Sequence, residues 1–192
     1  MHPTTILLSA LTLLTPTTAT LFTLLASQPG NPLNGKPINA AGGSFYIGLP
    51  LPSTYCPPEN KPNCPTGFAT VFANTPDTLW VEVPGGQSTY ILPTGEIRYA
   101  AAHSTFVPPG AYQGGWLNVT VFDLEPQPIK LAGWFPWPAP GQGGITACPT
   151  PSEGVYLINA KTPGFTRTDC VDLLGLKPAM QVEGEFGAWS YT

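Results

Sequence analysis

Proline and glycine set the tightest limit on what this chain can fold into. The 192 residues include 25 prolines and 21 glycines. After residue 19, no window of about 11 residues combines the 3.6-residue apolar period of a helix with freedom from both residue types. A proline inside a helix removes a backbone hydrogen bond and clashes with the preceding turn. The sequence therefore predicts a protein with almost no α-helix.

Short stretches rich in β-forming residues lie between the proline and glycine turns. We expect strands at 21–26, 44–48, 79–83, 89–92, 97–99, 116–122, 154–158, 170–174 and 187–191. Pro93 and Gly95 fit the second and fourth positions of a type I turn, so 89–92 and 97–99 should form a hairpin. The stretch 133–144 is expected to be a loop, because its prolines rule out a central strand.

These strands predict a single all-β domain over residues 20–192. The expected architecture is a compact antiparallel β-sandwich or barrel. Loosely similar hairpin stretches near 21–48, 79–99 and 154–191 permit a β-trefoil as the alternative. A mature length near 170 residues is typical of one domain with its own core.

The N-terminal segment resembles an export signal. Ile6 to Leu14 is an apolar run of about nine residues, too short for a bilayer, which needs roughly 20. Small residues at Thr17, Thr18 and Ala19 suit cleavage after Ala19, so residues 1–19 are interpreted as a signal peptide. The alternative is an N-terminal strand of the domain. We expect no membrane-spanning segment in the mature chain.

Four cysteines in an exported chain indicate two disulfides. Three pairings are possible, and closeness in sequence favours Cys56–Cys64 and Cys148–Cys170. Zinc is the competing interpretation, but the spacing has no Cys-x2-Cys pair. We therefore expect no metal, and the sequence contains no motif for a cofactor.

Charge excludes several classes of partner. Charged residues make up 9% of the chain, against about 25% in an ordinary soluble protein, and the net charge is −4. Nucleic acids and anionic lipids need clustered Lys and Arg, whereas the seven basic residues here are scattered. We expect no nucleic-acid partner.

Two patterns suggest contact with carbohydrate. Asn118 begins the one permitted Asn-x-Ser/Thr site, and alternation in 116–122 places it opposite Leu117, on a polar face open to a glycan. Trp134, Phe135 and Trp137 could form a platform on which sugar rings stack, although large aromatic residues are mostly buried.

Catalytic patterns are weak. His103 neighbours Ser104, but adjacent residues cannot make the nucleophile–base contact of covalent catalysis. Glu183 and Glu185 share a strand face, and Asp169 and Asp172 flank Cys170, without the cleft that two-carboxylate hydrolysis requires. The sequence therefore predicts a protein that is not an enzyme.

An ordered set of short motifs carries a family resemblance. The motifs lie across nearly the whole mature chain: 37–40, 45–48, 54–57, 64–65, 81–87, 90, 93, 95, 102–104, 108–110, 147–149, 170 and 189–192. The core Glu82-Val83-Pro84-Gly85-Gly86-Gln87 is their most specific part. This set resembles the fungal secreted family of the cell wall protein PhiA, whose relatives are also labelled IgE-binding proteins.

The resemblance implies a secreted, wall-associated, non-enzymatic protein linked to the development of spore-bearing cells. Its partners would be cell-wall polysaccharide or wall proteins. An extracellular carbohydrate-binding module and a host-directed, allergen-like effector are the alternatives, and an enzyme is the last.

Overall fold

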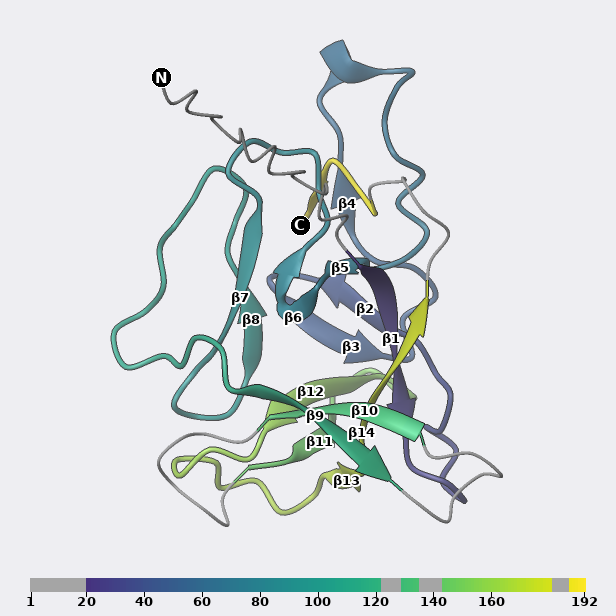
Figure 1. The fold of residues 1–192 in the computed structure, drawn as a ribbon, viewed down its shortest axis with the longest axis vertical. Helices are drawn as coiled ribbons and strands as arrows, with labels where there is room; N and C mark the ends of the chain where they lie inside the picture. The colour runs from purple at the N-terminus through teal and green to yellow at the C-terminus, as the bar shows by residue number, and fades with distance from the viewer. Residues whose placement is uncertain (1–19, 122–128, 135–142, 181–186) are drawn as a thin grey trace, which may run out of the picture.

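The computed structural model describes residues 20–121, 129–134, 143–180 and 187–192. The signal-peptide interpretation of residues 1–19 falls outside these ranges. Within these ranges, fifteen strands and one 3-10 turn make up the regular structure (Figure 1). The elements are β1 Leu21–Ser27, β2 Ile38–Ala41, β3 Ser44–Ile47, β4 Thr54–Tyr55, η1 Pro58–Asn60, β5 Phe72–Ala73, β6 Thr75–Leu79, β7 Gln87–Ile91, β8 Ile97–Tyr99, β9 Trp116–Val121, β10 Ile129–Trp134, β11 Ile145–Pro149, β12 Tyr156–Ala160, β13 Val171–Leu173, β14 Gly175–Met180 and β15 Ser190–Tyr191.

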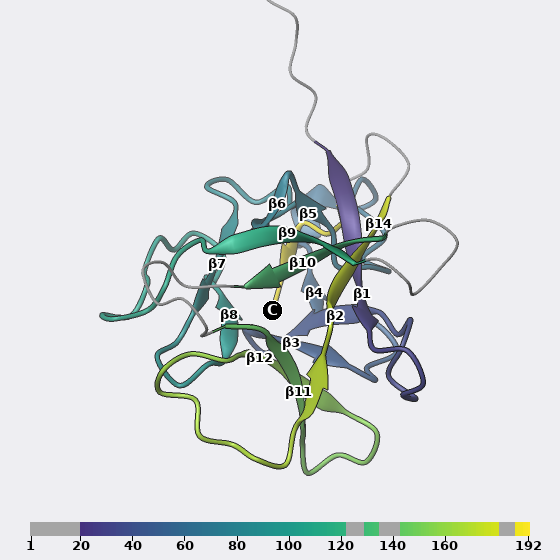
Figure 2. The same ribbon diagram turned by 60° about the horizontal axis from the view of Figure 1, so that its bottom comes forward.

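One long antiparallel sheet dominates the fold. Its strands follow the order β13-β11-β12-β3-β8-β7-β6-β5-β1-β14-β10-β9, with β2 paired to β3. The sheet curls around its own interior as a half-barrel (Figures 1 and 2), and β15 pairs with β4 beside it. The all-β, barrel-like expectation is confirmed. The strand order shows no threefold repeat within the described residues, so the barrel rather than the trefoil describes this fold.

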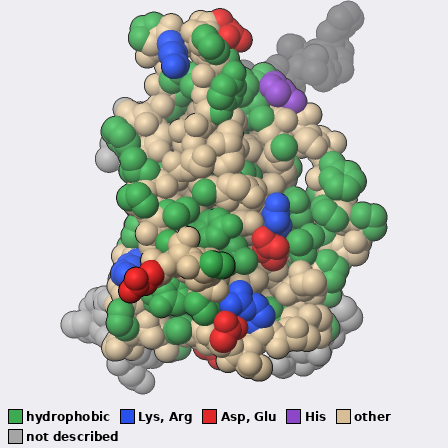
Figure 3. All heavy atoms as spheres, turned by 180° about the vertical axis from the view of Figure 1, so that it is seen from behind, with side chains coloured by type: hydrophobic (Ala, Val, Ile, Leu, Met, Phe, Trp, Pro, Cys, Tyr) green, Lys and Arg blue, Asp and Glu red, His purple; other side chains and the backbone are tan. Residues whose placement is uncertain are grey.

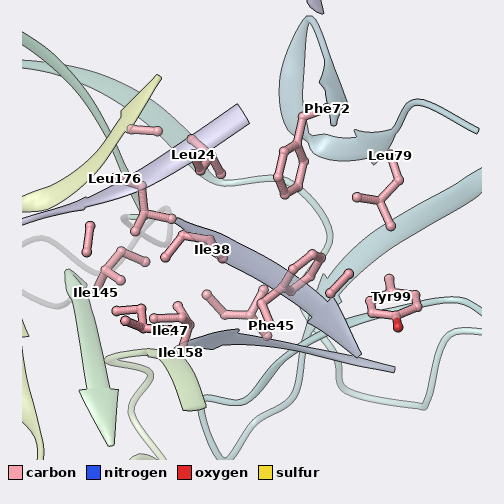
Figure 4. Packing of buried hydrophobic residues seen from close by; sticks show 14 of the residues in the cluster. Leu24, Ile38, Phe45, Ile47, Phe72, Leu79, Tyr99, Ile145, Ile158 and Leu176 are labelled. Atoms are coloured by element: carbon pink, nitrogen blue, oxygen red, sulfur yellow. The ribbon is translucent and has the colours of Figure 1, made fainter. Parts of the chain in front are cut away.

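The core occupies the inside of the curled sheet. Leu24, Ile38, Ile145, Ile158 and Leu176 are at most 2% exposed and point into one interior from five strands (Figure 4). A series of ring contacts continues from this core toward β15. The centroid distances are 5.8 Å for Phe22–Phe72, 5.6 Å for Phe45–Phe72, 5.3 Å for Phe45–Tyr99 and 6.5 Å for Tyr99–Tyr191, all in the range of favourable aromatic pairs.

Local turn chemistry was predicted well. The Gly95 amide donates to the Leu92 carbonyl at 2.8 Å, which closes the expected turn between β7 and β8. Gly95 has φ +98°, and a Cβ there would meet the Ala160 carbonyl and the Phe165 ring. Glycine is therefore required both by the backbone and by the close approach of β12.

Two predicted segments were wrong in part, and several strands were not predicted. The strand expected at 79–83 is β6, which begins at Thr75 and ends at Leu79; Val81 makes only a bridge to Ala188. Gly133 and Trp134, expected in a loop, end β10 between β14 and β9, because the prolines of that stretch begin only at Pro136. Strands β2, β4, β5, β10, β11 and β14 were not predicted, and Pro178 lies within β14.

The faces of β9 also differ from the expectation. Leu117 is 55% exposed, whereas Trp116 packs against the core. The alternating pattern correctly predicted a strand here. Which of its two faces is buried depends on how β9 packs over the barrel. Contrary to the expectation, Leu117 therefore does not lie on the inner face of β9.

Both expected disulfides are present. Cys56–Cys64 closes the loop between β4 and β5, and Cys148–Cys170 ties β11 to the start of β13. The sequence separations are 8 and 22 residues. On the chain-entropy model, closing these loops in the unfolded chain stabilises the fold by about 2.6 and about 3.4 kcal/mol.

Removing the two disulfides should therefore have unequal effects. We expect Cys148→Ala with Cys170→Ala to lower the free energy of unfolding more than Cys56→Ala with Cys64→Ala. Cys148 is fully buried, so this change also costs packing in the core, whereas the Cys56–Cys64 loop lies outside it. Urea unfolding of the two double variants measures the difference, and equal midpoints would contradict the expectation.

Candidate functional site

The C-terminal segment runs through one end of the molecule beside residues far away in sequence. The Gly187 amide donates to the Trp80 carbonyl at 3.0 Å, and the Val83 amide donates to the Trp189 carbonyl at 2.9 Å. On its other side, β15 pairs with β4, Ser190 opposite Tyr55. Figure 1 shows the C-terminus next to β4. Motifs that are separate in the sequence therefore meet at this end.

A buried carboxamide fixes the segment in place. The Gln87 side chain is fully buried, and its Oε1 accepts the Tyr191 amide at 2.7 Å. Its Nε2 donates to the carbonyls of Tyr191 and Ala100, each at 2.9 Å. Gln87 thus satisfies both backbone groups of Tyr191, as a neighbouring strand would.

The Tyr191 side chain adds a second anchor. Its ring is 1% exposed, and its hydroxyl donates to the Ala69 carbonyl at 2.7 Å and accepts the Val71 amide at 3.0 Å. A Cβ on Gly187 would collide with this hydroxyl, so glycine is required there. The C-terminal segment is therefore a rigid support for the side chains it presents.

Three rings meet on the outside of this support, and we call Tyr55, Trp189 and His103 the ring surface. The centroid distances are 5.8 Å for Tyr55–Trp189 and 5.7 Å for His103–Trp189. Tyr55 is 50% exposed, His103 is exposed and Trp189 is half-buried between them. Sequence reasoning did not single out Tyr55 or Trp189, although both belong to the motifs that carry the family resemblance.

His103 has an unusual backbone. Its φ is +59°, in the left-handed region that non-glycine residues seldom adopt. Such conformations persist where the surrounding structure holds them, and they cluster at functional sites. The Ser104 amide donates to the Ala101 carbonyl at 3.1 Å and closes this turn. The turn directs the His103 ring onto Trp189.

The structure does not assemble those catalytic candidates that it describes into one site. The Ser104 hydroxyl accepts the Phe106 amide at 3.2 Å, while the His103 ring faces Trp189. Asp172 pairs with Lys161 at 2.6 Å. Asp169 pairs with Arg167 at 2.7 Å, and the hydrogen bond from Arg167 lowers the pKa of the Asp169 carboxyl. Glu183 and Glu185 lie outside the described residues.

The predicted carbohydrate residues are only partly described. Trp134 ends β10, and the rings of the predicted platform, including Phe135 and Trp137, lie outside what the structure describes. Asn118 lies in β9 opposite Ala132, with its side chain outside the description too. Glycosylation of Asn118 and sugar contact by the tryptophans stay predictions. Among the described residues, no group of His, Cys, Asp and Glu could hold a metal ion.

Comparison with known proteins decides the family. The sequence profile of PhiA-like secreted proteins matches residues 22–192. The chain belongs to the PhiA-like secreted protein family. A relative from Arthroderma benhamiae, named only as an uncharacterized secreted protein, is 37% identical over 174 residues and covers 87% of this chain and 84% of its own. No solved structure matches the chain.

Family membership confirms the resemblance drawn from the motifs, and the protein is a secreted fungal protein. Oxidised cysteines agree with that location, because disulfides persist outside the reducing cytosol. Within the described ranges there is no helix long and apolar enough to cross a bilayer.

Replacing Tyr191 with Phe tests the support under the ring surface. We expect Tyr191→Phe to lower the free energy of unfolding by about 1–3 kcal/mol, because it leaves the Val71 amide and the Ala69 carbonyl without their partner. Tyr55→Phe is the matched control and should change stability by less than about 0.5 kcal/mol, since its ring is half exposed. Chemical denaturation of both variants measures the effect, and equal losses would contradict the assigned role.

Two buried tyrosines predict loss of stability at high pH. Burial raises the pKa of Tyr99 from 10.0 to about 12 and raises that of Tyr191 as well. Because the folded state holds these protons more tightly than the unfolded chain, their contribution is complete below about pH 10 and falls as the pH rises toward 12. For Tyr99 alone, about two pKa units correspond to roughly 3 kcal/mol. Urea unfolding from pH 8 to pH 12 should show a smaller loss in Tyr99→Phe; an identical pH profile would contradict it.

Proposed function

We propose that this secreted protein is a non-enzymatic interaction protein of the fungal cell wall, and that it holds wall components with the ring surface. The observation that carries the proposal is the contact of three rings from three separate segments on a rigid support. Exposed aromatic side chains bind partners well because they bury large areas with little loss of rotational freedom. A role in the development of spore-bearing cells is part of the proposal and rests on the family resemblance alone.

The charge distribution supports an uncharged partner. Arg98, Lys161 and Arg167 each pair with an acidic side chain within 3.0 Å. Figure 3 shows basic side chains next to acidic ones on a face that is otherwise hydrophobic or uncharged. A surface of this kind exerts little long-range attraction on charged ligands. Neutral wall polysaccharide and weakly charged wall proteins fit it better.

Cell fractionation tests the proposal. We expect tagged protein expressed in its native fungus to stay with washed walls. Tyr55→Ala combined with His103→Asn should move it into the medium and lower the wall-to-medium ratio by about tenfold, as loss of an aromatic anchor does at an interface. Asparagine suits the left-handed backbone at position 103, so the fold is retained.

Leu174→Ala is the matched control, because Leu174 is 45% exposed and contributes nothing to the ring surface. This variant should fractionate as the unaltered protein does. Absence of the unaltered protein from washed walls would refute the proposal. Turnover of a hydrolase substrate by the pure protein, abolished in His103→Asn, would contradict its non-enzymatic part.

A further inference from the structure

A groove lies next to the ring surface and is lined in part by Ala102 and Ser104, the two neighbours of His103. Its volume is about 420 Å³, within the usual range of ligand sites of about 300–1,000 Å³. Tyr99 and Tyr191 lie at it, with Gly43, Arg98, Ser104 and Phe106 around them. We infer that this groove binds a neutral oligosaccharide. The inference deepens the proposed function and rests on it for the source of the ligand, the polysaccharide of the wall.

Aromatic side chains supply the apolar part of the groove. Tyr90 lines it from β7, directly opposite Arg98 of β8 in the register, so both side chains are on one face of the hairpin. Phe106 lines it from the β8–β9 loop and is 68% exposed. A ring this exposed is accessible to a ligand in the groove. Flat rings of this kind stack on the apolar faces of sugar rings.

The loop that carries Phe106 is held at both ends. The Ala100 amide donates to the Ser88 carbonyl at 2.8 Å, and Tyr112 exchanges two hydrogen bonds with Ile91, of 2.8 and 2.9 Å. Between these points the loop bulges away from β7 and β8 at the left of Figure 1. In Figure 3, seen from behind, hydrophobic side chains gather along the corresponding right edge. The exposed Phe106 ring is therefore carried by a loop whose two ends are tied to β7.

The polar part of the groove suits hydroxyl groups rather than anions. Arg98 donates through Nε to the Gly43 carbonyl at 2.9 Å and through Nη1 to Glu96 at 3.0 Å. These bonds use two of the five N–H donors of a guanidinium, which leaves donors for ligand oxygens. The Glu96 carboxylate, which also accepts the Ser44 hydroxyl at 2.9 Å, balances the positive charge. A ligand rich in neutral hydroxyl groups fits this donor set.

Titration of the purified, disulfide-bonded protein with soluble oligosaccharides tests the inference. Calorimetry with a laminarin oligosaccharide and with a chitin oligosaccharide distinguishes the two wall sources, and polygalacturonate serves as the acidic comparison. We expect binding of one or both neutral ligands. Phe106→Ala should weaken it by about tenfold or more, as truncation of a central aromatic anchor does.

Phe68→Ala is a closely matched control. Phe68 is also 68% exposed but does not line the groove, so its loss should leave the affinity unchanged. Arg98→Lys, which keeps the charge and loses the planar fork, should weaken binding as well. Equal affinities of the Phe106→Ala and Phe68→Ala variants would overturn the inference, as would stronger binding of polygalacturonate than of either neutral ligand.

The outcome is separable from that of the proposed function. Protein that stays with washed walls but binds neither oligosaccharide would remove the groove inference and leave the wall proposal standing. If the protein binds an oligosaccharide but is absent from the wall fraction, the groove inference stands and the wall proposal fails.

Discussion

The buried carboxamide of Gln87 is the interaction on which the arrangement at this end of the molecule depends. It joins β7 to the β8–β9 loop at Ala100 and to the C-terminal segment at Tyr191, through three hydrogen bonds in a site closed to water. An amide side chain carries an acceptor oxygen and two N–H donors, so Gln87 can accept one backbone N–H and donate to two carbonyls at the same time. Loss of any one of these bonds would leave a buried polar group unpaired, which is costly.

The same anchor places two neighbouring surfaces. The C-terminal segment positions Trp189 against Tyr55 and His103, while Tyr191 and Tyr99 form part of the groove. A short C-terminal segment held by several hydrogen bonds thus presents rings in defined positions. Preorganised rings lose little freedom on binding, so such a surface can hold a neutral partner without strong charges.

The sequence predicted those features that depend on neighbouring residues. The turn at Gly95 follows from the φ values that proline and glycine favour, and both disulfides follow from export and short loop closure. Strand β14 contains Pro178, β10 runs into the proline-rich stretch 133–144, and prolines argue against a strand locally. Both segments are strands because β14 pairs with β1 and β10 pairs with β9, and these partner strands satisfy their backbone groups. Leu117 was assigned to the wrong face for the same reason.

By itself, the sequence determined an exported, oxidised, all-β chain with paired cysteines, because proline, glycine and cysteine act through local backbone geometry and redox chemistry. Only the tertiary structure decided which rings lie at the surface together. Tyr55, His103 and Trp189 come from segments up to 134 positions apart (189 minus 55), and no local pattern relates them. Their contact arises from long-range strand pairing and from the hydrogen bonds of Gln87, which exist only once the sheet has closed around its core.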